Sequence, residues 1–356
     1  MTPNPPNSAE IVLRAENLTK RYGDLLAVDR LSLEVRGGEI LGFLGPNGAG
    51  KTTAIGMMCG LLRPDAGETF IRGRPVRGGD PEALARVGLA PQSVILWPKL
   101  TGLEQLEFVG EMYGMPRPDA RRRGRELLET VGLAEKANKL ASTLSGGMQR
   151  RLNLVLALIH DPEIVILDEP EAGLDPQGRV LVRDYIRSLA RERGKTVILT
   201  THNMDEADRL ADRVAIIDRG RLLTLDTPEE LKHRVGEGDV LEIEVSDAPG
   251  EAPGPGGGAG PGGGAGHPVL RTLEELARAR GGVGAAGTTG ATGAASAATV
   301  SRVGHIITLR ARDAVNLVAA ALDTLRSAGF RPGAVHLRET TLEDVFIAFT
   351  GRSLRE

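Results

Sequence analysis

Cysteine and aromatic residues are scarce in this chain. Of its 356 residues only Cys59 is a cysteine, and 3% are aromatic. A single cysteine excludes an internal disulfide and a multi-cysteine metal site, and it suits a reducing cytoplasm. Few aromatic rings argue against a stacking platform for single-stranded nucleic acid. We predict that Cys59 is a small buried residue within a helix rather than a reactive thiol.

An excess of charge and long apolar runs are also missing. The formal net charge is -3, which implies no bulk attraction to nucleic acid or to an anionic membrane. No apolar run reaches the length that spans a bilayer. Residues 1–9 are expected to be a flexible N-terminus, and Met1–Ser8 lacks the basic-then-apolar pattern of a secretory signal. If the protein acts at a membrane, we expect it to need a partner that spans the membrane.

Strand and helix signals alternate over residues 10–235. Short all-apolar runs are typical of strands buried on both faces of a sheet. The stretches between them indicate helices, so we expect an α/β domain with a mainly parallel sheet. From about 93 to 160 the pattern is mostly helical, and this stretch is the expected helical subdomain. The predicted strands are Ile11–Leu13, Leu31–Val35, Ile40–Leu44, Ile164–Leu167, Val197–Thr200 and Val214–Ile217.

The composition changes after Val235, and residues 236–356 are expected to be a second, small α+β domain. Its predicted elements follow a β-α-β-β-α-β order, which is the ferredoxin-like arrangement. Two segments rich in Gly and Ala, 248–266 and 281–298, are expected to be flexible loops. The elements are strand Val240–Val245, helix Leu270–Arg280, a hairpin of Thr299–Arg302 and His305–Arg310, helix Ala314–Ala328 and strand Val335–Leu337.

A closing helix, Thr341–Thr350, follows the last strand. Its apolar stripe favours a helix that faces the core, with a dimer contact as the alternative. The stripe consists of Leu342, Val345, Phe346 and Phe349. Capping-box spacing occurs twice in this part of the chain, at Thr272 with Glu275 and at Thr340 with Glu343.

One glycine-rich run fits the G-x-x-x-x-G-K-[ST] pattern of a phosphate-binding loop. Its backbone N–H groups, together with a helix N-terminus, offer positive potential to phosphates. Lys51 would supply a charge to the β- and γ-phosphates, and Thr52 a hydroxyl to Mg²⁺. The predicted ATP-binding residues of this loop are Gly45, Pro46, Asn47, Gly48, Ala49, Gly50, Lys51, Thr52 and Thr53.

Two carboxylates end the predicted strand Ile164–Leu167. Open parallel sheets bind ligands at the carboxyl ends of their strands, so Asp168 is placed to hold Mg²⁺ through its water shell. Glu169 follows directly and can orient or deprotonate an attacking water molecule. The alternative, a pair of solvated acids at a strand end, is disfavoured by the apolar run before them.

Three further residues have both a site interpretation and a structural one. His202 ends a buried strand and could contact a γ-phosphate, but a lone histidine is more often structural. Gln92 has an amide that can reach Mg²⁺ or water, although a surface glutamine is the commoner case. Tyr22 could stack on adenine or could be a partly exposed edge residue.

The run Leu144-Ser145-Gly146-Gly147-Met148-Gln149-Arg150 lies between the two motifs. Together with Gly173-Leu174-Asp175 and His202, in this order, the motifs resemble the ATP-binding cassette (ABC) ATPases over residues 10–235. The resemblance implies a P-loop fold with an antiparallel β edge, and ATP with Mg²⁺ as ligands. It also implies a head-to-tail homodimer in which Ser145, Gly146, Gly147 and Gln149 of one copy face the ATP of the other.

The resemblance gives Asp175 a role and strengthens the local interpretations of Tyr22 and His202. Asp175 would connect the two sites across the dimer, Tyr22 would stack on adenine, and His202 would contact the γ-phosphate. Glu171 departs from the family pattern, because many relatives carry a small hydroxyl residue there. The resemblance therefore implies Glu169, His202 and Gln92 as catalytic residues, and Thr52, Gln92 and Asp168 as Mg²⁺ ligands.

Most family members drive membrane transporters. The region 92–114 corresponds to the part that receives a helix of the membrane subunit. The segment Thr340–Gly351 resembles the tail of ABC-2 type exporter ATPases. We therefore expect an exporter subunit at the cytoplasmic face of the cell membrane, with a separately encoded permease and no nucleic acid as partner. Plausible groove residues are Leu96, Trp97, Leu100, Met112 and Tyr113, each of which could instead pack in the helical subdomain.

Two other functions are possible on sequence alone. One is a soluble ABC ATPase of the cluster-assembly type that acts on a cytoplasmic protein. The extension after Val235 argues against it only weakly. The other is a nucleotide sensor without hydrolysis, which the presence of Glu169 and His202 disfavours.

Overall fold

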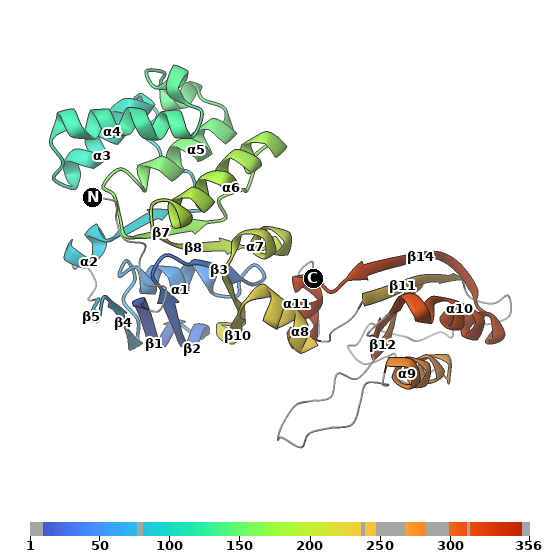
Figure 1. The fold of residues 1–356 in the computed structure, drawn as a ribbon. Helices are drawn as coiled ribbons and strands as arrows, with labels where there is room; N and C mark the ends of the chain where they lie inside the picture. Colours follow the sequence, from blue (N-terminus) through green and yellow to red (C-terminus); the bar gives the residue numbers. More distant parts are fainter. Residues whose placement is uncertain are drawn as a thin grey trace. The chain divides into compact units, whose positions relative to one another are not determined.

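The structure is a computed structural model that describes residues 10–76, 81–235, 239–246, 268–281, 299–311 and 314–350. The chain divides into two compact units, Met1–Pro228 and Glu229–Glu356, and Figure 1 labels their elements. Two segments predicted to be flexible, 1–9 and 248–266, lie outside the described residues. The third, 281–298, also lies outside them except for Gly281, which is the last residue of helix α9.

A six-stranded sheet forms the centre of the first unit. Its order is β10-β9-β3-β8-β7-β6, and the five strands from β9 to β6 are parallel while β10 pairs antiparallel with β9. The strands span Ile40–Leu44 (β3), Val87–Ala90 (β6), Ile164–Asp168 (β7), Thr196–Thr201 (β8), Arg213–Asp218 (β9) and Arg221–Asp226 (β10). The predicted mainly parallel sheet is confirmed, although β6 and β10 were not predicted.

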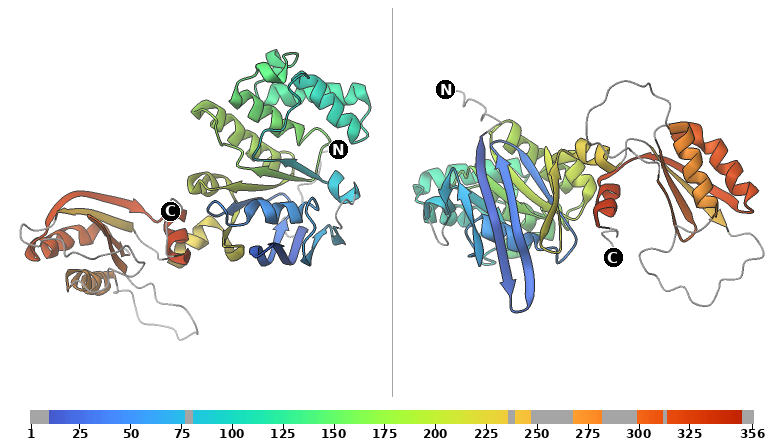
Figure 2. Two further views of the ribbon diagram at one scale, coloured as in Figure 1. Left: turned by 180° about the vertical axis from the view of Figure 1, so that it is seen from behind. Right: turned by 90° about the horizontal axis from the view of Figure 1, so that it is seen from below.

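An antiparallel sheet of order β2-β1-β4-β5 lies in the same unit. Figure 2 shows its long strands β1 and β2 side by side in the view from below. They extend well beyond the predicted Ile11–Leu13 and Leu31–Val35, since each has 12 residues. The bounds are Ile11–Tyr22 (β1), Leu25–Arg36 (β2), Ala66–Ile71 (β4) and Arg74–Pro75 (β5). This sheet is the predicted antiparallel β edge.

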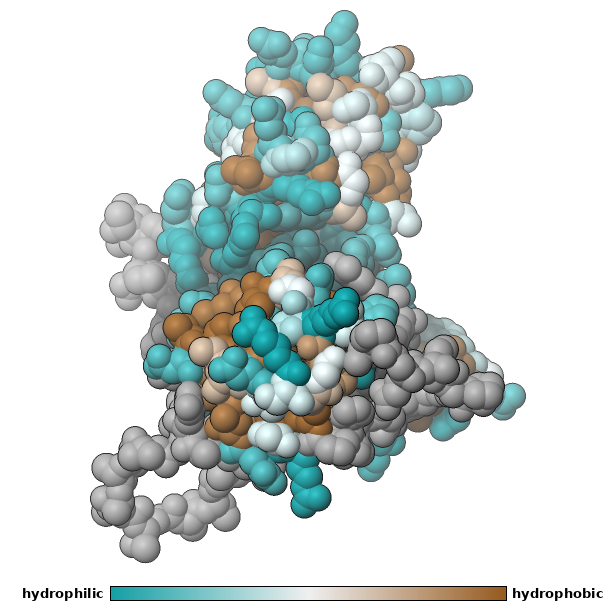
Figure 3. All heavy atoms as spheres, turned by 90° about the vertical axis from the view of Figure 1, so that its right-hand side faces the viewer, coloured by the Kyte–Doolittle hydropathy of each residue, from teal (hydrophilic) through white to brown (hydrophobic). Residues whose placement is uncertain are grey.

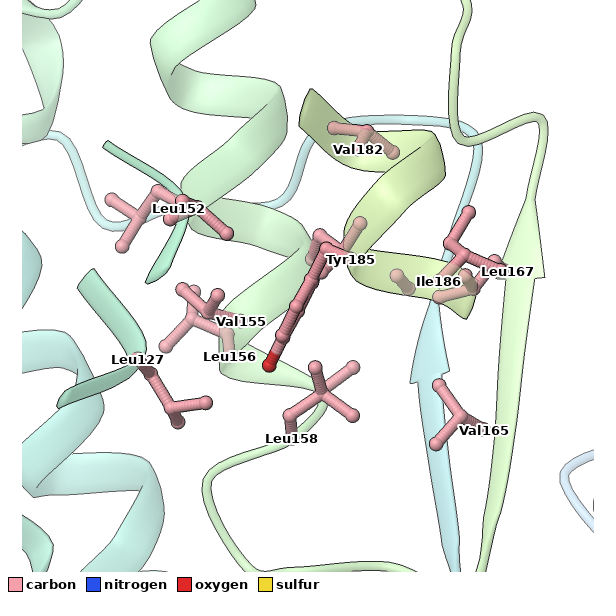
Figure 4. Packing of buried hydrophobic residues seen from close by; sticks show 14 of the residues in the cluster. Leu127, Leu152, Val155, Leu156, Leu158, Val165, Leu167, Val182, Tyr185 and Ile186 are labelled. Carbon is pink, nitrogen blue, oxygen red and sulfur yellow. The ribbon is translucent and has the colours of Figure 1, made fainter. Parts of the chain in front are cut away.

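Helices cover the central sheet from both sides. Alternate residues of β7 enter different cores, because Val165 and Leu167 join one apolar cluster while Ile164 and Ile166 join the other. The first cluster includes the helical region, and Figure 4 shows Tyr185 lying among its aliphatic side chains. The second includes the helix after the phosphate loop and buries Cys59, as predicted. Burial raises the pKa of the Cys59 thiol to about 12, which makes the thiolate inaccessible at neutral pH.

The helices of this unit have the following bounds: Lys51–Met58 (α1), Pro81–Ala85 (α2), Gly102–Met112 (α3), Arg117–Thr130 (α4), Gly146–Leu156 (α5), Pro176–Arg191 (α6) and Met204–Leu210 (α7). The predicted helical subdomain corresponds to α3, α4 and α5 with two short 3-10 turns between them, at Ala134–Lys136 and Ala141–Thr143. Thr101 and Glu104 form a complete capping box at the start of α3, which fixes where that helix begins.

The second unit contains the predicted β-α-β-β-α-β order. Its antiparallel sheet has the order β12-β13-β11-β14, and an apolar cluster joins the sheet to helices α9 and α10. The bounds are Pro228–Val235 (α8), Asp239–Ser246 (β11), Pro268–Gly281 (α9), Thr299–Val303 (β12), Ile306–Ala311 (β13), Val318–Ser327 (α10), Arg331–Glu339 (β14) and Leu342–Thr350 (α11), with a 3-10 turn at Ala314–Leu317. Figure 3 shows hydrophobic and hydrophilic residues side by side on the near face of this unit.

Both predicted capping boxes in this unit are wrong. Helix α9 begins at Pro268, so Thr272 lies inside the helix and cannot cap its start. At α11 the cap is shifted by one residue, because the backbone N–H of Asp344 donates to Thr341 and the N–H of Thr341 donates to Asp344. The stripe of α11 is largely buried as predicted, since Leu342, Val345 and Phe346 are buried. Phe349 is the exception and is 41% exposed.

Candidate active site

The phosphate loop joins the buried strand β3 to helix α1. Lys51 is the first residue of α1, and its Nζ donates to the carbonyl oxygens of Gly45 at 2.7 Å and Pro46 at 3.1 Å. Burial lowers the pKa of Lys51, while Glu169 and Asp168 act in the opposite direction. The lysine side chain therefore bonds back to carbonyls of its own loop, and its charge interacts with the two carboxylates.

Two glycines of this loop leave no room for a side chain. A Cβ on Gly45 would lie 2.4 Å from the carbonyl oxygen of Ile217, and one on Gly50 would lie 2.3 Å from that of Ala27. Gly50 also has a φ of 98°, a conformation that other residues rarely adopt. The loop glycines are thus required by close backbone packing as well as by any ligand. The remaining predicted loop residues, Asn47, Gly48 and Ala49, lie in the same turn, and Thr53 lies in α1.

Asp168 ends β7 beside the start of α1. Its Oδ2 lies 3.4 Å from Oγ1 of Thr52, while its other oxygen accepts a hydrogen bond from Thr200 of the neighbouring strand β8. Asp168 and Thr200 are both buried. Thr200 was not predicted as a site residue, although a threonine pair at the end of an apolar strand is a visible signal. The parallel pairing of β7 with β8 places Thr200 directly opposite Asp168.

Glu169 is held by contacts from three sides. Its Oε1 lies 2.9 Å from Nδ1 of His202, and its Oε2 accepts from Nε2 of Gln92 at 3.2 Å. Its backbone N–H donates to the carbonyl and hydroxyl oxygens of Thr200. The φ of Glu169 is 52°, which is uncommon outside glycine and asparagine and needs support from the surroundings. The structure therefore brings together all three residues that the sequence suggested as catalytic.

Arg150 provides part of that support and was not predicted as a site residue. It is 7% exposed, and its guanidinium donates to the backbone carbonyls of Pro91 and Gln92 and to those of Asp168 and Glu169. One side chain from α5 thus joins the segment that carries Gln92 to the end of β7. No clear signal for this role is present in the sequence, because Arg150 is one of several polar residues in α5.

The Ser-Gly-Gly turn begins α5 and lies at its exposed N-terminus. Ser145 is the N-cap, and its hydroxyl accepts from the backbone N–H of Met148 at 3.3 Å. Gln149 turns back to the preceding loop, where its Nε2 donates to the carbonyls of Ala141 and Leu144. Within one copy, Gln149 therefore holds the loop that precedes the Ser145 turn. An open helix N-terminus with glycines is suited to an anionic group.

The loop between β7 and α6 approaches the same turn. A Cβ on Gly147 would lie 3.4 Å from the side chain of Leu174. Asp175 is the N-cap of α6, and its Oδ1 accepts from the backbone N–H of Gly178 at 2.8 Å.

Tyr22, at the end of β1, is half exposed, with Lys20 Nζ 5.8 Å from its ring centre. About half of the tyrosine surface is therefore accessible to solvent.

A buried acid that the sequence did not reveal lies beneath the turn that carries His202. Glu206 of α7 accepts a hydrogen bond from Oγ1 of Thr201 at 2.6 Å, and Thr201 also accepts from the N–H of Asn203. Burial raises the pKa of Glu206 to about 7, with Glu171 and Glu169 acting in the same direction. Glu206 therefore holds the hydroxyl of Thr201, which in turn bonds the backbone of Asn203 on the other side of His202.

A groove of about 320 Å³ lies next to the catalytic residues in the same unit. Trp97 and Tyr113 line it as predicted, whereas Leu96, Leu100 and Met112 are not among its lining residues. Tyr113 stacks on His160 with 3.8 Å between ring centres. The lining consists of Cys59, Leu61, Leu84, Val87, Leu89, Pro91, Ile95, Trp97, Val109, Tyr113, Asn153, Leu156, Ala157 and His160. Apolar residues from β6 and α5 supply much of the wall of this groove.

These features define a P-loop ATPase of the cassette type. Residues 28–172 match the family model described as ABC transporter. The chain is 40% identical to a Nod factor export ATP-binding protein I of Ralstonia nicotianae, over 99% of this chain and 98% of that protein. It is 35% identical to a daunorubicin resistance ATP-binding protein of Streptomyces coeruleorubidus, over 98% of each. The chain therefore belongs to the ATP-binding proteins of ABC transporters, and it is an ATPase.

Solved structures agree with this assignment for the first unit. A dimeric ATP-binding cassette, MJ0796, bound to ADP and phosphate in a post-hydrolysis state, superposes with a TM-score of 0.56 at 28% identity. The match covers 60% of this chain and 98% of that one. Within the described parts of the chain, none of the helices combines the length and apolar character needed to cross a bilayer.

Proposed function

We propose that the chain is the ATPase subunit of an exporter and works as a head-to-tail homodimer under a separately encoded permease, at the cytoplasmic face of the membrane. Support comes from relatives that match nearly the whole chain and are named for Nod factor export and daunorubicin resistance. A linearmycin resistance ATP-binding protein of Bacillus subtilis is also 42% identical, over 66% of this chain and 75% of that protein.

Glu169 is the proposed base of the hydrolysis step. The oxygen of the attacking water bonds to the γ-phosphorus, the bond between that phosphorus and the β–γ bridging oxygen breaks, and ADP leaves with that oxygen. The proton of the water passes to a carboxylate oxygen of Glu169. His202 and Gln92 hold this carboxylate at 2.9 Å and 3.2 Å, so it is already oriented before the substrate binds. Lys51 supplies positive charge to the phosphates.

The residues beside Lys51 fit a magnesium ion. Mg²⁺ prefers hard oxygen ligands and keeps several of its waters. Thr52 offers a hydroxyl, and Asp168 offers a carboxylate whose Oδ2 lies 3.4 Å from that hydroxyl. Gln92 donates to Glu169 through its amide nitrogen, which leaves the amide oxygen for a ligand. When bound, the ion neutralises charge on the β- and γ-phosphates.

The Ser145 turn and Asp175 are the proposed contribution of the second copy. An exposed helix N-terminus with Gly146 and Gly147 can donate N–H groups to the γ-phosphate of a partner. Asp175 begins the neighbouring helix α6. A dimer that closes on ATP would thus bury each nucleotide between the phosphate loop of one copy and this turn of the other. Tyr22, which is half exposed, is proposed to stack on adenine.

One observation carries the transport proposal: a single segment reaches both the hydrolysis site and the apolar groove. Gln92 contacts Glu169, and only three residues later Ile95 lines the groove. Asn153 of α5 holds the segment at both ends, since its Nδ2 donates to the carbonyl of Pro91 and its Oδ1 accepts from the N–H of Ile95. A helix of the permease that fills the groove would press directly on the segment that positions Gln92.

Co-expression with a membrane protein encoded beside the chain tests this proposal. A tag on the chain should recover that membrane protein from detergent, and reconstitution into lipid should change the ATPase rate. Ile95→Asp should reduce recovery of the membrane protein while the melting temperature of the subunit stays near that of the wild type, because Ile95 is 65% exposed. Glu68→Gln, at an exposed position of β4, is the control. Strong ATPase activity without any membrane partner would contradict the proposal and favour a soluble ABC ATPase.

A further inference from the structure

Glu171, where this chain departs from the family pattern, forms a buried two-bond ion pair. Nε of Arg183 donates to its Oε1 at 3.0 Å, and Nη2 donates to its Oε2 at 2.8 Å. Glu171 is 6% exposed. The fork geometry of the guanidinium matches both carboxylate oxygens, so the pair fixes direction as well as distance.

The pair connects the loop at 169–175 to the helix that follows it. Glu171 lies two residues after Glu169, and Arg183 lies in α6, whose N-cap is Asp175. Within the loop, Ala172 N–H donates to the carbonyl of Glu169 and Leu174 N–H donates to the carbonyl of Glu171. Any shift of Glu171 would therefore move Glu169 at one end and Leu174 at the other.

Packing alone does not fix this side of the loop. A cavity of about 80 Å³ lies there, bounded by residues of the loop and by residues around the turn of His202. A loop that packs against neighbouring residues on only one side can adopt other conformations. The cavity is lined by Glu169, Glu171, Ala172, Arg179, Thr201, His202, Asn203 and Glu206. The ion pair thus supplies a constraint that apolar contacts do not.

We propose that Glu171 is a positioning residue. Its pair with Arg183 holds the loop so that Glu169 faces the water of one ATP site while Leu174 supports the Gly147 turn that serves the other. Leu174 is buried and its side chain lies against the Gly147 position. Glu169 has the strained φ of 52°, which persists only when neighbouring contacts determine it. This inference rests on the proposed roles of Glu169 and of the Ser145 turn.

Steady-state ATPase assays on the purified full-length chain test the inference with Glu171→Gln, Arg183→Met and the double variant. Each single change should lower kcat by roughly 10- to 100-fold, because a small misplacement of the base is costly. KM for ATP should stay within about twofold, since the phosphate loop is untouched. The double variant should lose no more than the worse single variant, because both changes remove one shared contact.

Glu107→Gln is the matched control, since Glu107 is also buried and pairs with Arg121 at 2.7 Å in the helical subdomain. It should lower the melting temperature without lowering kcat. Arg183→Lys keeps the charge but loses the two-bond geometry of the guanidinium. Its kcat should lie between that of the wild type and that expected for Arg183→Met, at unchanged KM, and this variant serves as the test if the others fail to fold.

The inference would be overturned if the folded variants kept the wild-type kcat, or if the losses in kcat were additive in the double variant. It would also be overturned if a rise in KM accounted for the loss of catalytic efficiency. Loss of folding in every variant, Arg183→Lys included, would overturn it too, because the pair would then serve only the fold. The assay needs no permease, so failure to recover a membrane partner would count against the proposed function and not against this inference.

Discussion

Nδ1 of His202 lies 2.9 Å from Oε1 of Glu169. The two residues come from the ends of neighbouring strands, since β7 and β8 pair in parallel and Glu169 and His202 each follow the last residue of one strand. Glu169 is buried, whereas the side chain of His202 is 58% exposed. His202 therefore has one ring nitrogen engaged with the carboxylate, while much of its ring is exposed.

Glu169→Gln should abolish turnover and leave ATP binding intact. The amide keeps the shape of the side chain but cannot accept the proton, and general-base contributions are typically 100- to 10,000-fold, so a loss of about 1,000-fold in kcat is expected. The variant should also accumulate as an ATP-bound dimer, measured by size-exclusion chromatography with and without ATP. Glu68→Gln at an exposed position of β4 is the control. A Glu169→Gln protein that hydrolyses ATP at nearly the wild-type rate would show that the base has been misassigned.

Gly50→Ala should lower the thermal stability of the protein far more than Gly48→Ala. Both glycines have positive φ, 98° and 78°, so both substitutions bear a similar backbone penalty of about 1 kcal/mol. Only the Cβ on Gly50 would meet backbone, 2.3 Å from the carbonyl oxygen of Ala27, whereas a Cβ on Gly48 has nothing within 4 Å. Thermal unfolding without nucleotide should separate the two. Equal losses of stability would mean that the close approach at Gly50 is relieved by movement of the loop.

Local patterns were enough to predict most of the buried strands of the central sheet, with β6 as an exception. Ile40–Leu44 was predicted with the bounds that the structure gives, because an all-apolar run before a glycine loop leaves little freedom. The order of the second unit was predictable for a similar reason, since each element has its own apolar period. These features depend on neighbours in the sequence.

Features that depend on distant residues could not be predicted in this way. Arg150 reads as one more polar residue of a helix until the structure places four carbonyls from two segments around it. Thr272 has the right spacing for a cap, but the helix starts earlier, at Pro268, where proline is well tolerated in a first turn. Glu171 was noticed as unusual, yet its partner Arg183 is 12 residues away on another element.

Arg150→Met should destabilise the protein more than Arg151→Met. Arg150 donates to four backbone carbonyls, while Arg151 donates to that of Val131. Two of these carbonyls keep a second donor, because Asn153 also donates to that of Pro91 and the N–H of Ala172 also donates to that of Glu169. A buried acceptor left without a donor costs about 1–3 kcal/mol. The free energy of unfolding, measured by urea denaturation, should therefore fall more for Arg150→Met than for Arg151→Met, and kcat should fall with it because Glu169 loses support. Similar losses in the two variants would show that water replaces the guanidinium at these carbonyls.

Glu206→Gln should remove a dependence of stability on pH. The pKa of Glu206 rises from 4.5 to about 7 in the folded protein, so the folded state binds more protons than the unfolded state between these values. Stability consequently decreases as pH rises from about 4.5 to 7. Above pH 7 the full cost of the buried carboxylate is present, and the shift corresponds to at most about 3 kcal/mol.

The amide of that variant can still accept the hydrogen bond of Thr201, and it carries no charge near Glu169 and Glu171. The variant should therefore be more stable than the wild type at pH 8 and close to it at pH 4.5. Urea unfolding at both pH values measures this difference, with exposed Glu68→Gln as the control. If the gain at pH 8 is absent, the positive charge of Arg183 already stabilises an ionised Glu206, and the proton stays off this residue throughout the neutral range.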